Sequence, residues 1–167
     1  MELVGNLINI FGEELPAEAD KLSIVRKPEY LDGNNQLKFG KEYSKDADSN
    51  GFDIKYKIKK KKLVAGEVYV RFGVEKGAYL TAPHTPYEKL SMPYILETVP
   101  FHVYQVNPKY KKRPRYVYEG ITAIDFEQPG GGIQYYIKSS SVQLLIQDEV
   151  LIEISPEEYL INKETYN

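Results

Sequence analysis

The sequence predicts a mainly β protein of the α+β class, with a compact central antiparallel or mixed sheet and a short N-terminal helical segment. Three observations lead to this prediction. The chain has 167 residues, which is enough for one core that buries roughly 70% of the unfolded surface. Its first residues place apolar side chains at helical spacing. After residue 66 it consists of short segments rich in Val, Ile and Tyr, separated by Gly and Pro.

The helical segment is expected over residues 2–15. Apolar side chains recur there every three or four residues, and Pro16 closes the segment. These side chains belong to Leu3, Leu7, Ile10 and Phe11. We assign residues 1–62 to a helical and loop extension that packs on the core, and residues 63–167 to the main domain.

A polar surface connection is expected over residues 32–51, where turn-forming residues dominate. The spacing of Asp46, Asp48 and Asn50, followed by Gly51, is similar to the start of a calcium loop. The order of ligands is nevertheless wrong, and no Glu closes the loop. We therefore expect no metal at this loop.

Six β-rich segments are expected in the rest of the chain. Several of them alternate apolar with polar residues, as half-buried strands do. They cover residues 67–72, 79–81, 101–106, 115–118, 134–137 and 144–154. This part of the chain is therefore predicted to be mainly sheet.

The composition argues against nucleic acid and membrane as partners. Formal net charge is −2, so the chain lacks the positive field that drives binding to phosphate backbones. Lys57 and Lys59–Lys62 form its basic cluster, which we expect to be a solvated face. No stretch approaches the roughly 18 to 20 apolar residues that span a bilayer, and the N-terminus lacks signal-peptide features. With no cysteine and two separated histidines, a zinc site is not expected.

Five short motifs follow one another in the second half. They are Val70-Arg71-Phe72-Gly73, Gly77-Ala78-Tyr79-Leu80-Thr81, Thr85-Pro86-Tyr87-Glu88, Phe101-His102-Val103-Tyr104 and Phe126-Glu127-Gln128-Pro129-Gly130-Gly131-Gly132-Ile133-Gln134-Tyr135. In this order they resemble the NAD-glycohydrolase domain of the tuberculosis necrotizing toxin family, over roughly the last three-fifths of the chain. The glycine-rich string is the most specific of them.

The resemblance implies an NAD-binding cleft with a defined set of side chains. By motif position, Gln134, Arg71 and His102 are the implied catalytic residues. The implied substrate-binding residues are Tyr79, Phe72, Gln128, Gly130, Gly131 and Gly132. Gln134 is favoured over Gln128 as the key glutamine, although both flank the triple glycine. NAD would be the substrate, and neither a cofactor nor a metal is implied.

The chemistry of these residues suits the implied roles but leaves alternatives open. A guanidinium grips two oxygens of a pyrophosphate at once, which suits Arg71, although a salt-bridged surface arginine would look the same. The three glycines let the backbone approach a ligand with N–H groups in the cleft, or they form a flexible hairpin turn. Tyr79 could stack on nicotinamide or be an ordinary strand residue. His102, on the strand face of Tyr104, is equally a structural histidine.

Breaking the nicotinamide–ribose bond builds positive charge on the ribose while nicotinamide leaves as a neutral group, so no strong general acid is required. Stabilisation of the developing sugar cation and placement of a water would accelerate the step. Gln134 could supply its carbonyl oxygen while the protein holds its NH₂ group.

The sequence departs from the family at two places. Residues 123–126, Ala-Ile-Asp-Phe, stand where a Pro-Trp pair is expected, which predicts a changed cleft wall. Residues 89–93, Lys-Leu-Ser-Met-Pro, stand where an arginine often follows, so a second phosphate contact is in doubt.

The implied activity is hydrolysis of NAD or NADP to nicotinamide and ADP-ribose, which depletes the dinucleotide in a target cell. Two other functions stay open: ADP-ribosyl transfer, for which Glu127 is the nearby carboxylate, and a non-catalytic NAD-binding module. Similarity to secreted toxins further implies delivery as part of a larger toxin, action in the target-cell cytosol, and a cognate immunity protein in the producing cell.

Overall fold

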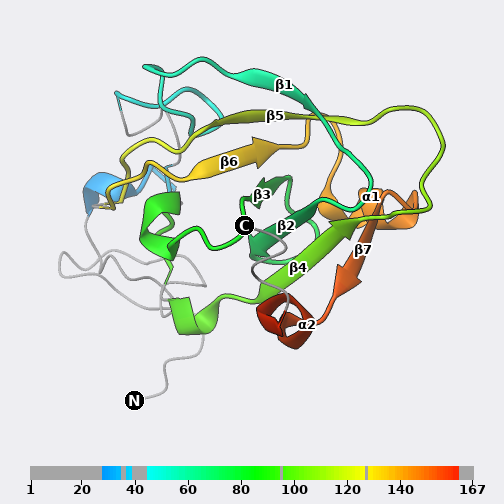
Figure 1. Cartoon of the computed structure of the whole chain (residues 1–167). Coiled ribbons are helices and arrows are strands. Elements are labelled where there is room, and N and C mark those ends of the chain that lie inside the picture. Colours follow the sequence, from blue (N-terminus) through cyan, green and yellow to red (C-terminus); the bar gives the residue numbers. More distant parts are fainter. Residues whose placement is uncertain (1–27, 35–36, 39–44, 95, 127, 162–167) are drawn as a thin grey trace.

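The computed structural model describes residues 28–34, 37–38, 45–94, 96–126 and 128–161, and its centre is a seven-stranded antiparallel sheet (Figure 1). The strands are β1 (Lys59–Lys62), β2 (Val68–Phe72), β3 (Tyr79–Thr81), β4 (Phe101–Val106), β5 (Tyr116–Ile121), β6 (Ile133–Tyr136) and β7 (Leu151–Ile154). Their order across the sheet is β1-β5-β6-β3-β2-β4-β7. The predicted mainly β, α+β class is therefore confirmed. The helix expected over residues 2–15 lies outside the described residues.

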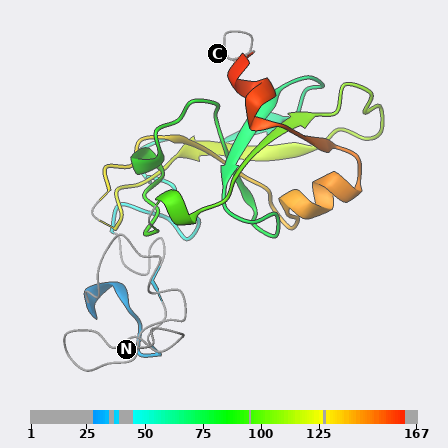
Figure 2. The same ribbon diagram turned by 90° about the horizontal axis from the view of Figure 1, so that it is seen from below.

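Two short helices lie on opposite faces of the sheet (Figure 2). Helix α1 (Val142–Gln147) packs Val142 and Leu145 into the main core, which includes Tyr69 and Tyr104. We call this side the α1 face. Helix α2 (Pro156–Ile161) packs Tyr159 against Val68, Val70 and Val103, and we call that side the α2 face. The described residues also contain three 3₁₀ turns, which are η2 (Pro28–Tyr30) ahead of the sheet and η4 (Tyr87–Leu90) and η5 (Leu96–Thr98) between β3 and β4.

The strand predicted over residues 144–154 is wrong in its first half, which is helical. Ser141 caps the helix, because its hydroxyl accepts a hydrogen bond from the Leu144 N–H at 3.2 Å. Val142 and Leu145 are buried three residues apart, as one helix face requires, whereas Leu144 is exposed. Glu149 then turns the chain with φ 62° before β7 begins. A short apolar run of this kind is compatible with the spacing of a helix and with that of a strand, so the sequence alone does not separate them.

Strand β1 was not expected, because four consecutive lysines have low β-propensity. It forms through pairing of Lys59–Lys62 with β5 at the edge of the sheet. Lys59, Lys60 and Lys62 are exposed to solvent. Exposed lysines also protect an edge strand from pairing with other chains.

The segment before β1 packs more than the sequence suggested. Phe52 is 1% exposed and covers Gly120 of β5, where an added Cβ would lie 2.6 Å from the Phe52 ring. The Asp48 carboxylate accepts the N–H groups of Asn50 and Phe52 at 2.8 and 3.0 Å. The aspartate that resembled a calcium ligand therefore closes its own turn. Ala47 is buried within the expected surface connection, and Phe52 and Asp53 directly after it are buried too.

The described part of the N-terminal extension contacts the loop that follows β5. Tyr30 is 2% exposed, and its ring lies 5.5 Å from that of Phe126, centroid to centroid. Among the described residues, no helix is long and apolar enough to cross a membrane.

Candidate active site

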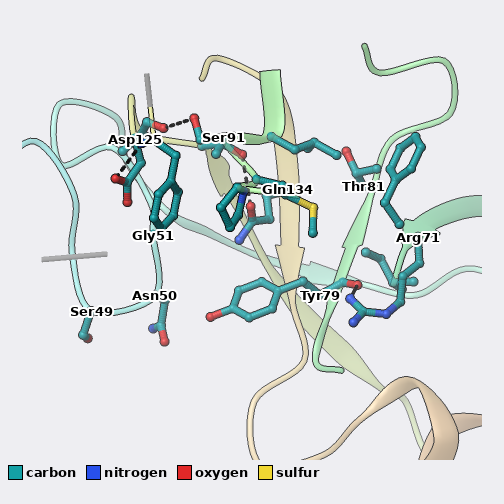
Figure 3. A pocket seen from close by; sticks show the side chains of 17 residues that line it. Ser49, Asn50, Gly51, Arg71, Tyr79, Thr81, Ser91, Asp125 and Gln134 are labelled. Atoms are coloured by element: carbon teal, nitrogen blue, oxygen red, sulfur yellow. Dashed lines mark hydrogen bonds between the residues drawn. The ribbon is translucent and has the colours of Figure 1, made fainter. Parts of the chain in front are cut away.

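A pocket of about 280 Å³ opens on the α2 face, where β3 and β6 meet three loops (Figure 3). Register places Thr81 beside Val70 and Gln134 beside Thr81, so these side chains share this face. The lining residues are Ser49, Asn50, Gly51, Arg71, Phe72, Tyr79, Leu80, Thr81, Leu90, Ser91, Met92, Pro93, Thr122, Ala123, Asp125, Phe126 and Gln134. Four predicted site residues are thus brought together: Arg71, Phe72, Tyr79 and Gln134.

Arg71 enters the pocket from the edge between β2 and β3. Its Nε donates to the carbonyl of Val74 at 2.7 Å, and its Nη1 donates to the carbonyl of Tyr79 at 2.8 Å. These two neutral acceptors fix the plane of the guanidinium. No carboxylate of the described residues forms an ion pair with it. Burial lowers the pKa of Arg71 from its ordinary value, which reflects the cost of keeping this cation partly out of water.

Two glycines make room for this guanidinium. A Cβ on Gly73 would lie 2.8 Å from Nη2 of Arg71, and a Cβ on Gly77 would overlap the same nitrogen. Gly73 also has φ 140°, a conformation that side chains disfavour. The glycines of the RFG and GAYLT motifs therefore serve the position of Arg71.

Gln134 lies between β5 and β3 in the middle of the pocket wall. Its Oε1 accepts a hydrogen bond from the Thr122 hydroxyl at 3.1 Å. The sequence predicted that the protein would hold the NH₂ end of this amide, so the orientation differs. A hydroxyl both donates and accepts, so a half-turn of the amide would let Nε2 donate to Thr122 and free the carbonyl. Thr122 is thus a partner for either orientation.

Tyr79 and Phe72 supply the aromatic part of the lining. The Tyr79 ring packs against Tyr136 with centroids 5.2 Å apart, and burial raises the pKa of its hydroxyl to about 12. Phe72 packs against Phe101 and Tyr87, each at 5.1 Å. The Tyr79 hydroxyl points across the pocket toward the loop of Ser49 and Asn50 (Figure 3).

Several lining residues were missed by the sequence analysis. Ser91 is buried, has φ 51°, and donates to the Ala123 carbonyl at 2.6 Å. Asp125 is buried, and its Oδ1 accepts the Phe126 N–H at 2.8 Å. The signal in the sequence was the departure from the family pattern at residues 89–93 and 123–126. Residues of both segments line the pocket, so the departures lie at this site, and the changed cleft wall stays a prediction.

The triple glycine lies outside the lining and supports it from behind. Gly131 donates its N–H to the Thr122 carbonyl at 2.8 Å, and Gly132 donates to the Lys89 carbonyl at 3.0 Å. These two N–H groups therefore do not point into the pocket, contrary to expectation. A Cβ on Gly130 would lie 2.6 Å from the Thr122 carbonyl oxygen. The glycines let the chain run close against the segment of Thr122 and Lys89, which positions Gln134.

Gln128 and His102 also lie outside the lining. The Gln128 N–H donates to the Asp125 carbonyl at 2.8 Å in a turn next to the pocket. His102 faces Arg71 across β2 and β4, but its Nδ1 lies 3.2 Å from Oε1 of Glu153 and its ring stacks on Tyr104. The pocket thus contains the favoured glutamine and not the reserve.

The charges of the pocket are few. Among its described lining residues, Arg71 is the one with a cationic side chain and Asp125 the one with an acidic side chain. The described residues contain no group of three or more His, Asp or Glu side chains arranged to hold a metal ion. This arrangement can bind an anion at one end, hold flat rings along apolar walls, and present amide and carboxylate oxygens at the other end.

Two solved structures and one protein family are similar to this chain. A solved structure of tuberculosis necrotizing toxin complexed with its immunity factor is similar, with a TM-score of 0.56 and 18% identity, covering 89% of this chain and 75% of that one. A weaker similarity, with a TM-score of 0.44 and 15% identity, is to Tse6 in complex with Tsi6, covering 64% of this chain and 77% of that one. No curated protein sequence matches the chain. The family model described as tuberculosis necrotizing toxin matches residues 62–154, which is more than half of the chain. The chain therefore belongs to the tuberculosis necrotizing toxin family.

Proposed function

We propose that this protein is a glycohydrolase of NAD or NADP, which splits the bond between nicotinamide and ribose to release nicotinamide and ADP-ribose. The observation that carries the proposal is the convergence of Arg71, Tyr79 and Gln134 from three strands on one pocket. The family resemblance implies these same residue types for NAD binding and cleavage.

Arg71 would bind the pyrophosphate. Its guanidinium is held by two carbonyls, is partly buried, and has no ion pair with a described carboxylate. Burial removes part of the hydration of such a cation, and an anionic ligand replaces it with charge-assisted hydrogen bonds. The pyrophosphate of a dinucleotide supplies that anion in a form that matches the planar fork of donors.

The rest of the pocket would take the nicotinamide riboside end. Its volume of about 280 Å³ suits one end of a dinucleotide, since whole-ligand sites run from about 300 to 1,000 Å³. Phe72, Leu90 and Met92 supply apolar walls for a flat ring, and the Tyr79 ring lies beside them. The adenosine end would then extend toward solvent.

Cleavage needs no strong acid. The bond from the ribose anomeric carbon to the nicotinamide nitrogen breaks, and its electron pair stays on nicotinamide, which leaves as a neutral molecule. Positive charge develops on the ribose. The Gln134 carbonyl, in the amide orientation that Thr122 permits, and the Asp125 carboxylate would stabilise that charge. Water then bonds to the anomeric carbon and loses a proton to solvent, which gives ADP-ribose.

We further propose a cognate immunity protein as the partner of this chain, and delivery as part of a larger toxin that acts in the cytosol of a target cell. The solved structure of tuberculosis necrotizing toxin contains its immunity factor, which supports a protein partner of this kind. Depletion of NAD would harm the producing cell unless such a partner blocks the enzyme.

The test is incubation of the purified chain with NAD and with NADP, followed by chromatography of the products. Stoichiometric release of nicotinamide and free ADP-ribose is expected. ADP-ribose attached to a protein acceptor would instead establish a transferase. Binding of NAD without release of nicotinamide would establish a non-catalytic module, and either result would overturn the proposal.

A further inference from the structure

A second concavity, of about 330 Å³, lies at the other end of β6. It is lined by Lys60, Arg113, Pro114, Arg115, Tyr116, Tyr118, Lys138 and Ser139. None of these residues lines the candidate active site. Register places Lys60 beside Tyr118, and Tyr118 beside Tyr136, so the concavity faces the same side of the sheet as the active site but over β1 and β5.

The concavity is strongly and unevenly charged. Four of its side chains are cationic and none is acidic. Arg115 forms an ion pair with Asp148 at 3.0 Å. Lys60, Arg113 and Lys138 form no ion pair with any carboxylate of the described residues. Three like charges without a counter-charge repel one another, and a polyanion would remove that repulsion.

Aromatic rings contact two of the cations, and hydrogen bonds to backbone carbonyls fix the chain at the two arginines. Nζ of Lys60 lies 4.6 Å from the centroid of the Tyr116 ring, and Nζ of Lys138 lies 5.9 Å from that of Tyr118. The Arg115 carbonyl accepts the Leu63 N–H at 2.9 Å, and the Arg113 carbonyl accepts the Tyr110 hydroxyl at 2.8 Å. The loop between β4 and β5 is thus tied at both arginines.

We propose that this concavity is a binding site for a linear di- or triphosphate group, as in a nucleoside triphosphate or in inorganic polyphosphate. Two arginines of the lining offer planar forks for phosphate oxygens, and two lysines of the lining offer point charges. A single phosphate would engage a part of this set, whereas a chain of phosphates would reach all four cations. The site is separate from the proposed NAD site and does not depend on it.

The test is calorimetric titration of the full chain with inorganic tripolyphosphate and, separately, with ATP at low salt. Saturable binding of one equivalent of each is expected. Lys60→Ala combined with Lys138→Ala should raise Kd about 10-fold or more, because two charge-assisted hydrogen bonds are lost. The matched control is Lys57→Ala combined with Lys111→Ala, which removes the same charge from exposed lysines outside the concavity and should leave Kd nearly unchanged.

Three results would overturn the proposal. One is the absence of saturable tripolyphosphate binding. Another is an equal rise in Kd for the concavity double variant and for the control double variant, which would indicate a general effect of charge. The third is loss of tripolyphosphate binding in Arg71→Ala while the Lys60→Ala and Lys138→Ala double variant still binds normally. That result would place tripolyphosphate in the proposed NAD site. Circular dichroism of each variant separates misfolding from loss of binding.

Discussion

Arg71 and His102 stand directly opposite each other on neighbouring strands, yet their surroundings differ completely. The Arg71 guanidinium reaches the pocket, bonds to two neutral carbonyls, and has no described carboxylate in an ion pair. His102 lies outside the lining, between the Glu153 carboxylate and the Tyr104 ring. Strand alternation therefore decides which face a residue occupies, but the glycines and loops around it decide whether it meets a ligand.

The difference is also one of electrostatics. His102 already has an acidic neighbour, so a ligand has little to add there. Arg71 is partly buried without a counter-charge, and an anionic ligand would supply it. We accordingly expect substitutions on the pocket side to change catalysis or binding, and substitutions on the His102 side to change stability at most.

Gln134→Ala should have the largest effect. Loss of the amide that faces the developing ribose charge is expected to lower kcat by about 10² to 10³. The matched control is Gln128→Ala, which removes the same side chain from the other flank of the triple glycine and should leave turnover close to wild type. Initial rates of nicotinamide release measure both. Loss of activity in Gln128→Ala alone would reverse the assignment of the two glutamines.

Arg71→Lys should mainly weaken binding. An ammonium cannot reproduce the fork that holds two carbonyls and two phosphate oxygens together, so KM should rise about 10-fold with a smaller change in kcat. Steady-state kinetics with NAD measure the split. An unaltered KM would show that the guanidinium does not bind the substrate.

Gly77→Ala should displace the Arg71 guanidinium without changing any charge. The new methyl would overlap the guanidinium and displace it, so KM should rise by several-fold. Gly33→Ala is the control, because a Cβ there meets nothing within 4 Å. If Gly77→Ala folds and its kinetics match wild type, the present position of the guanidinium is not the one that binds substrate.

The sequence predicted the strands well because alternation of apolar and polar residues is a local signal. Segments 79–81 and 101–106 coincide with β3 and β4. Strand β1 was not predicted because lysine has a low propensity for strands. Helix α1 was not predicted because a short apolar run is compatible with both helical and strand spacing. In each case tertiary packing decides what local propensity leaves open.

The candidate site was predicted in the same uneven way. Motifs identified Arg71, Tyr79 and Gln134, which lie in or beside strands. The opposite wall comes from loops, and its residues, such as Asn50 and Asp125, reach the pocket through long-range pairing of Phe52 with Thr122. No short-range pattern encodes such pairing. The glycine loop was predicted to direct N–H groups into the cleft, but the N–H groups of Gly131 and Gly132 donate to backbone carbonyls instead.

Tyr104→Phe should stabilise the His102 side. The Tyr104 hydroxyl is fully buried and has no hydrogen-bond partner among the described residues, so removing it should raise the free energy of unfolding by about 1 kcal/mol. Thermal unfolding measures this, and a clear loss of stability would contradict it. Catalysis should not change.

The same variant carries a pH signature. Burial, and then Glu153 and Glu75, raise the pKa of the Tyr104 hydroxyl well above its ordinary value. The folded state therefore keeps this proton where the unfolded state releases it. This contribution to stability is complete below about pH 10 and is lost as pH rises toward the folded-state pKa. Phenylalanine has no such proton, so the advantage of Tyr104→Phe over wild type should widen between pH 8 and pH 11.

His102→Gln should have the smallest effect. His102 contributes one half-exposed contact between its Nδ1 and the Glu153 carboxylate, and surface pairs of this kind are worth about 0–1 kcal/mol, so stability should fall slightly and kcat/KM should stay near wild type. Glu153→Gln removes the partner and should behave alike, and the double variant should cost little more than either single variant because all three break one interaction. A fall in kcat/KM confined to His102→Gln, with stability intact, would mean that the imidazole acts on the substrate. The contrast between the two facing residues would then be a contrast of two catalytic roles, and the ring would have to leave Glu153 to reach the pocket.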